Sequence, residues 1–230
     1  MSSKEIQYED HFREERDLGK VSLGPMIASA WRNDPKRVGI KLSRYKVVAK
    51  IVSNFGNVLE VGVGDGWASK LICREVNNFY ASDFDVKWRI YIEESLSSLK
   101  SFKGYFEFDP IKESFPLEGI LFDAIIALDV LEHVHPENEF KFISNLCKSI
   151  DKETGIAIFG MPSLESQIYA SEGSKIGHVN CQNGENLKKN LENYFQRVII
   201  LSFNDEIMHM GFYPMSHYLL AICFGVKNSA

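Results

Sequence analysis

The chain has 230 residues and a formal net charge of −5, from 26 Lys and Arg against 31 Asp and Glu. Its 45% apolar and 25% charged residues exclude a wholly disordered chain, and the length suits one large domain or two small ones. The negative charge disfavours nucleic-acid binding, which needs a basic face. The longest apolar stretch, residues 218–226, is too short to span a membrane.

The N-terminus is charged throughout and lacks the apolar core of a secretory signal. The cysteines are widely spaced and form no CxxC pair, which is typical of reduced thiols rather than of disulfides or a zinc site. These cysteines are Cys73, Cys147, Cys181 and Cys223. We therefore expect a cytoplasmic protein.

The first 37 residues are polar, and we expect short helices and a loop there that together form a candidate lid. The apolar spacing over residues 37–55 predicts an amphipathic helix, after which strand-like and helix-like runs alternate. The predicted strands are 57–61, 79–82, 105–108, 122–128, 155–161, 198–203 and 217–224, and the later helices are 67–75, 86–99, 137–150 and 184–194.

This alternation, with continuously apolar strands, predicts a parallel sheet covered by helices on both faces. The last two strands leave no room for a helix between them, so they should form an antiparallel hairpin. We predict an α/β fold with a Rossmann-like, doubly wound sheet of seven strands, six parallel and one antiparallel near the edge. It would form one domain over residues 38–230, with rim insertions at 162–183 and 204–216 and the lid at 1–37.

A glycine-rich turn follows the first predicted strand. Glycine allows positive φ and the close approach of a ligand, and the start of the next helix offers free N–H groups. A dinucleotide fingerprint would need a third glycine at the position of Trp67, which weakens an NAD-binding interpretation. A purely structural turn is the alternative. The residues concerned are Glu60, Gly62, Gly64 and Gly66.

Two aspartates end the next two predicted strands. A carboxylate at Asp83 can accept both hydroxyls of a ribose, and one at Asp109 can accept the amino group of adenine. Each aspartate also has a structural interpretation, Asp83 as a helix cap and Asp109 as a turn residue before a proline.

The fourth predicted strand and its continuation read FDAIIALDVLEHV, from Phe122 to Val134. With this motif the sequence resembles the class I S-adenosylmethionine-dependent methyltransferases, in the branch that combines E-x-G-x-G-x-G with D-V-L-E-H-V. The order and spacing of the motifs agree over about residues 37–161. The resemblance implies S-adenosylmethionine as the cofactor, bound by Glu60, Gly62, Gly64, Gly66, Asp83, Phe84, Asp109, Asp129 and Val130.

Charge agrees with this cofactor, because its sulfonium and ammonium groups favour carboxylate neighbours such as Glu60 and Asp129. Upstream, the segment Arg44-Tyr45-Lys46 is a candidate source of a cation for the cofactor's carboxylate, with a solvated helix face as the alternative. The fourth strand lacks the [DNS]-P-P-[YF] ending of enzymes that methylate base amines, and no Pro-Cys dipeptide is present for attack on cytosine. We therefore expect a small-molecule acceptor and no nucleic-acid partner.

The two insertions should rise on the same rim as the glycine loop, where the acceptor would bind. Candidate substrate-binding residues there are Tyr169, Asn180, Asp205, Glu206, His209 and Tyr213. An alcohol acceptor needs a base, and the candidate catalytic residues are His178 and His133, whose pKa is ordinarily near neutral. An acceptor oxygen that is already anionic needs none. We predict no metal, although Asp205, Glu206, His209 and Asp129 would suit a hard divalent ion.

The C-terminal segment is similar to methyltransferases of bacterial surface-polysaccharide pathways, which implies O-methylation of a sugar or a sugar-attached group. Alternatives are methyl transfer to a nitrogen or carbon of another metabolite, an NAD-dependent sugar-modifying oxidoreductase, and a non-catalytic nucleoside-binding protein with this fold. The oxidoreductase requires glycine in place of Trp67 and a Tyr-x-x-x-Lys pair, which the relevant region lacks.

Overall fold

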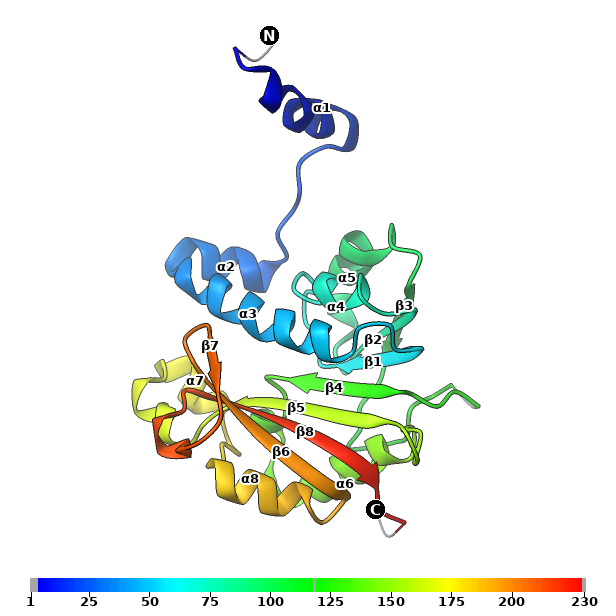
Figure 1. The fold of residues 1–230 in the computed structure, drawn as a ribbon, viewed down its shortest axis with the longest axis vertical. Coiled ribbons are helices and arrows are strands. Elements are labelled where there is room, and N and C mark those ends of the chain that lie inside the picture. The colour runs from blue at the N-terminus through cyan, green and yellow to red at the C-terminus, as the bar shows by residue number, and fades with distance from the viewer. Residues whose placement is uncertain (1–3, 118, 229–230) are drawn as a thin grey trace.

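The computed structural model describes residues 4–117 and 119–228 (Figure 1). Within these residues the chain forms one eight-stranded sheet in the order β3-β2-β1-β4-β5-β8-β6-β7. The strands are β1 Asn57–Val61, β2 Asn78–Asp83, β3 Phe102–Glu107, β4 Ala124–Leu128, β5 Ile156–Pro162, β6 Phe195–Asn204, β7 Ile207–His209 and β8 Tyr218–Val226.

Six strands share one direction, as predicted. Strands β1 to β5 pair in parallel, and β8 is antiparallel to both β5 and β6, so β6 runs with the first five. The expected antiparallel hairpin is present in β6 and β8. The prediction of seven strands, with the reversed strand near the edge, was wrong in two respects. Strand β8 lies inside the sheet between β5 and β6, and β7 is an eighth strand at the edge.

Strand β7 forms because β6 continues to Asn204 and the chain then reverses. Asp205 has a φ of 50°, which turns the chain so that Ile207 pairs with Asn204 and His209 with Ser202. The 204–216 insertion is therefore partly a two-stranded extension of the sheet rather than an open loop.

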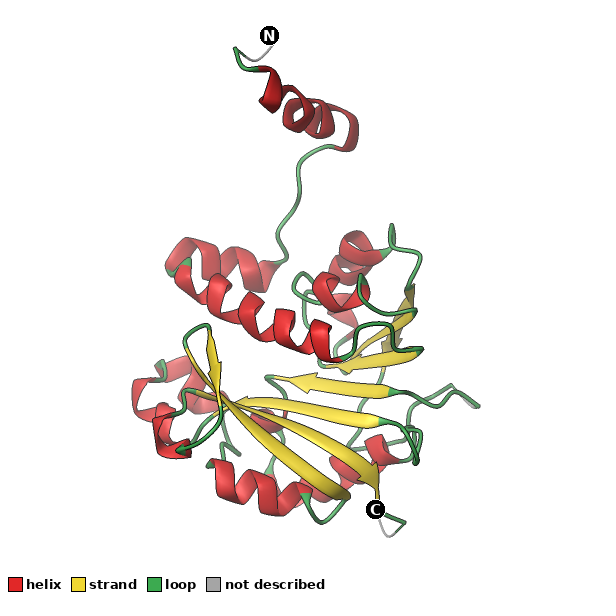
Figure 2. Ribbon diagram, in the orientation of Figure 1, coloured by secondary structure: helices red, strands yellow, loops and turns green. Residues whose placement is uncertain are grey.

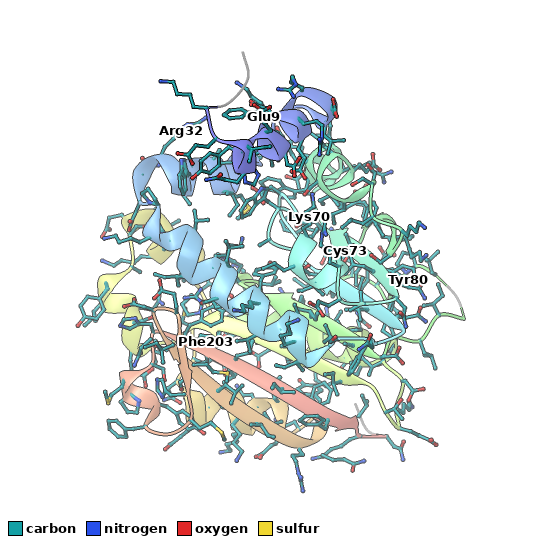
Figure 3. All side chains as sticks on the ribbon, turned by 45° about the horizontal axis from the view of Figure 1, so that its top comes forward. Glu9, Arg32, Lys70, Cys73, Tyr80 and Phe203 are labelled. Carbon is teal, nitrogen blue, oxygen red and sulfur yellow. The ribbon has the colours of Figure 1, made fainter. Side chains whose placement is uncertain are left out.

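Helices cover both faces of the sheet (Figure 2). The continuous apolar strands supply both cores by alternation: Ile126 of β4 packs on the side of α3, α4 and α5, and Ile125 packs on the side of α6 and α8. Cys73, at the end of α4, is buried (Figure 3). The helices are α1 Glu9–Leu18, α2 Pro25–Asn33, α3 Lys36–Ile51, α4 Lys70–Cys73, α5 Arg89–Leu96, α6 Pro136–Cys147, α7 Glu172–Gly177 and α8 Gly184–Leu191, with short 3-10 helices at Ile6–Tyr8, Val86–Trp88, Leu131–His133, Glu165–Tyr169 and Tyr213–Met215.

The predicted helix over 67–75 is confined to α4, because the chain from Gly62 to Ser69 is spent in turns. At the N-terminus, α1 stands apart from the sheet and buries none of its residues, whereas α2 packs on α3 and buries Ile27 (Figure 1). No helix in the described part of the chain is long and apolar enough to cross a membrane. All four cysteines are free thiols.

Candidate functional site

The glycine loop lies at the carboxyl end of β1, where the sheet order reverses. Strand β1 pairs with β2 on one side and β4 on the other, which makes this the point of the sheet where open α/β folds bind their ligands. The φ values of Gly62, Gly64 and Gly66 are 73°, 56° and 66°, which residues other than glycine rarely adopt. A Cβ on Gly62 would lie 2.3 Å from Cγ2 of Val130. The loop therefore needs glycine for both its conformation and its close packing.

Glu60 is buried at the end of β1. The hydroxyl of Tyr45, on α3, donates a hydrogen bond of 2.8 Å to its Oε1. Its Oε2 has no hydrogen-bond partner among the described residues. Burial raises the pKa of Glu60 to about 7. The nearby hydroxyls of Ser69 and Tyr45 oppose this rise in pKa. The site thus holds a buried carboxyl group whose charge a nearby cation would stabilise.

Asp83 ends β2 and faces the loop. Its Oδ2 accepts the N–H of Gly64 at 3.1 Å and its Oδ1 accepts the N–H of Asp85 at 3.1 Å. Burial raises its pKa. The carboxylate is therefore already oriented beside the glycine loop, next in sequence to Phe84, whose ring is exposed. Asp109 is engaged in its own turn instead, because it accepts the N–H of Ile111 at 3.0 Å and pairs with Lys112.

Asp65 within the loop connects it to the N-terminal segment, a role that the sequence motifs did not indicate. Its Oδ2 accepts the N–H groups of Met26 and Ile27 at 2.9 and 3.0 Å. These are the first free donors of α2, so Asp65 caps that helix from a distant part of the chain. The side chain of Met26 also reaches Gly64, where a Cβ would lie 2.8 Å from its sulfur.

Asp129 follows β4 with a φ of 57°. Nη1 of Arg44 lies 3.9 Å from Oδ1 of Asp129, and the guanidinium carbon lies 3.7 Å from the ring centroid of Tyr218. Arg44 is therefore mostly buried, stacked on an aromatic ring and directed at Asp129, rather than part of a solvated helix face. Val130, the next residue, packs on Gly62.

The structure brings together His133, from the short 3-10 helix after β4, and His178, which directly follows α7. Their ring centroids are 5.2 Å apart. Burial lowers the pKa of His178, and the charge of His133 adds to this effect. Glu132 lies beneath them, and burial together with the negative charge of Asp129 raises its pKa well above the ordinary value.

The other rim candidates each have their own local surroundings. Tyr169 is exposed, Asn180 donates to Oε2 of Glu139 on α6 at 2.6 Å, and the ring of Tyr213 packs on Gly184. In the 204–216 insertion, Asp205 and Glu206 are exposed and His209 is half-buried. Within the described chain these three residues form no metal-ligand set, so the alternative cation site fails. Among the described residues, one group of metal-ligating side chains does come close together, namely Glu132, His133 and His178.

Comparison with known proteins supports the fold. No protein-family model and no curated protein matches the sequence. Among solved structures, the chain is similar to the methyltransferase domain of bacterial CtHen1, with a TM-score of 0.64 and 15% identity over 81% of this chain and 99% of that one. It is also similar to the N-methyltransferase NodS from Bradyrhizobium japonicum, with a TM-score of 0.61 and 15% identity over 85% and 99% of the two chains.

A third similar structure is an S-adenosylmethionine-dependent methyltransferase from Clostridium acetobutylicum. Its TM-score is 0.60, with 13% identity over 94% of this chain and 97% of that one. The chain therefore has the Rossmann-like methyltransferase fold that its motifs predict.

Proposed function

We propose that this protein is an S-adenosylmethionine-dependent methyltransferase. The observation that carries the proposal is Glu60, a buried carboxylate with an oxygen that has no partner among the described residues, beside a loop of three positive-φ glycines. A buried carboxyl group beside a glycine loop fits a cofactor that is cationic and has no pyrophosphate. The similar structures include NodS with S-adenosylhomocysteine and a DhpI complex with S-adenosylmethionine, which supports the same cofactor here.

The binding residues are proposed as follows. Glu60 and the loop glycines hold the methionine part of the cofactor, and Asp83 accepts the ribose hydroxyls, with Phe84 against the adenine. Asp109 reaches the adenine amino group only by giving up part of its own turn.

Asp129 and Val130 border the methionine end, and Arg44, held on Tyr218, supplies a cation there. When bound, the cofactor supplies a methyl group on a positive sulfur, which keeps the C–S electron pair as the acceptor's lone pair forms the new bond.

For the acceptor we propose an oxygen of a soluble small molecule, with a sugar or sugar-attached hydroxyl as the leading class and the cytoplasm as the compartment. The rings of His133 and His178 lie next to each other in the segments that follow β4 and α7. An imidazole can serve a hydroxyl in one of two ways, by accepting its proton or by holding a cation that acidifies it. The remaining rim candidates, such as Tyr169 and Tyr213, would contact the rest of the acceptor.

An amine acceptor is the second candidate, favoured by the similarity to an N-methyltransferase. One assay distinguishes the two. The protein is incubated with S-adenosylmethionine carrying a labelled methyl group and with matched sugars that differ only in a hydroxyl or an amino group. We expect labelled methyl ethers by mass spectrometry. Labelled methylamines alone would show that the enzyme methylates nitrogen rather than oxygen. Consumption of NAD instead of S-adenosylmethionine would contradict the methyltransferase proposal.

A further inference from the structure

Glu132, His133 and His178 offer one ligand atom each, and these atoms all lie within 4.8 Å of one another. Glu132 and His133 belong to the short helix after β4, whereas His178 comes from the 162–183 insertion. Backbone hydrogen bonds join the two segments, because the carbonyl of Glu132 accepts the N–H groups of Val179 and Asn180 at 2.9 and 3.0 Å. The three side chains are thus held together by the fold itself.

Both imidazoles are oriented by a second hydrogen bond. Nδ1 of His133 lies 2.8 Å from the carbonyl oxygen of Gly177, and Nδ1 of His178 lies 2.8 Å from Oε1 of Gln167. The amide of Gln167 is itself oriented, because its Nε2 donates to the carbonyl of Ser163. Since both partners are acceptors, each Nδ1 carries the hydrogen, and in the neutral form of each imidazole the lone pair is then on Nε2. Metal-binding histidines are typically held in this way.

The carboxylate of Glu132 supplies an independent indication. The residue is 1% exposed, and its Oε2 has no hydrogen-bond partner among the described residues. A buried carboxyl oxygen without a hydrogen-bond partner is costly. A cation between Glu132 and the two imidazoles would supply the missing partner.

We propose that Glu132, His133 and His178 bind one divalent first-row transition-metal ion, with open coordination positions that take the hydroxyl oxygen of the acceptor. Two imidazoles and one carboxylate favour zinc, manganese, iron or cobalt over calcium and magnesium, which prefer oxygen ligands. The acceptor part of this inference rests on the proposed function. The ion stays divalent throughout; it lowers the pKa of the bound hydroxyl, whose proton leaves to solvent while the oxygen keeps the electron pair.

The test uses cobalt(II) as the probe. Full-length protein stripped with a chelator and dialysed is titrated with Co²⁺, and visible ligand-field absorption reports coordination. We expect one Co²⁺ per chain. His178→Ala and Glu132→Gln should each weaken binding by at least about tenfold, the lower end of the loss seen when even an outer partner is removed. His135→Ala removes an exposed imidazole two residues from His133 and should leave binding unchanged.

Gln167 provides a test of positioning. Gln167→Ala should also weaken Co²⁺ binding about tenfold, and Gln167→Glu, which keeps an acceptor for His178, should restore it. Wild-type protein without a cobalt band, or binding that is equal in wild type and His178→Ala, would overturn the proposal. The wild-type titration decides even if a variant does not fold. S-adenosylhomocysteine binding by the chelator-treated protein is measured separately, so loss of the metal site is distinguishable from failure of the methyltransferase proposal.

Discussion

Oδ2 of Asp65 accepts the backbone N–H of Ile27 at 3.0 Å, across 38 positions of sequence. This bond and its companion at Met26 fasten the start of α2 to the glycine loop. The approach is so close that a Cβ on Gly24 would lie 2.4 Å from Cβ of Asp65. Of the N-terminal segment predicted as a lid, the α2 part is therefore anchored directly on the loop that would hold the cofactor, whereas α1 buries no residue.

Substitution of Asp65 tests this anchor. Asp65→Ala removes the cap of α2 and should lower the free energy of unfolding by about 1 kcal/mol, with faster hydrogen exchange in α2. Asp65→Asn keeps an acceptor oxygen and should lose much less. Equal exchange in α2 for wild type and Asp65→Ala would show that the contact does not hold the segment.

The role of Asp83 is tested by affinity. Asp83→Ala should weaken S-adenosylhomocysteine binding by about 2 kcal/mol, roughly thirtyfold, because a charge-assisted hydrogen bond is lost. Glu107→Ala, at the exposed carboxylate beside Asp83 in the sheet register, is the matched control and should bind as wild type. An unchanged dissociation constant for Asp83→Ala would refute the ribose assignment.

The order of the main strands along the chain was predictable because strands such as β4 and β5 are continuously apolar and helices such as α3 have helical spacing of apolar residues. The contacts that build the site could not be predicted from the sequence in the same way. The bonds of Asp65 and the convergence of Glu132 with His178 depend on segments that only the fold brings together. Strand β7 was missed because residues 204–216 have no strand-like alternation, and its pairing depends on the turn at Asp205.

From the raised pKa of Glu60 we predict that the free energy of unfolding depends on pH. Its pKa is raised from 4.5 to about 7, so the native state holds the proton more tightly than the unfolded chain does. The Glu60 contribution to the free energy of unfolding is thus complete below pH 4.5 and falls as pH rises to about 7, by roughly 3 kcal/mol at most. Glu60→Gln should flatten this part of the cofactor-free stability curve. Parallel wild-type and variant curves from chemical denaturation would contradict the shift.

Gly62 tests the shape of the loop. Gly62→Ala combines a positive φ with overlap against Val130, so we expect at least about 2 kcal/mol of destabilisation and loss of cofactor binding. Gly225→Ala is the matched control, with a φ of 66° but only the Gln196 side chain nearby. It should cost about 1 kcal/mol and leave binding intact. Normal binding by Gly62→Ala would show that the ligand lies elsewhere.

Titration calorimetry with S-adenosylhomocysteine, and in parallel with NAD, tests the identity of the ligand most directly. We expect one S-adenosylhomocysteine per folded chain, with affinity reduced in Asp83→Ala, and no heat from NAD. Saturable binding of NAD would contradict a methyl-donor site at the glycine loop. So would correctly folded protein that binds neither ligand.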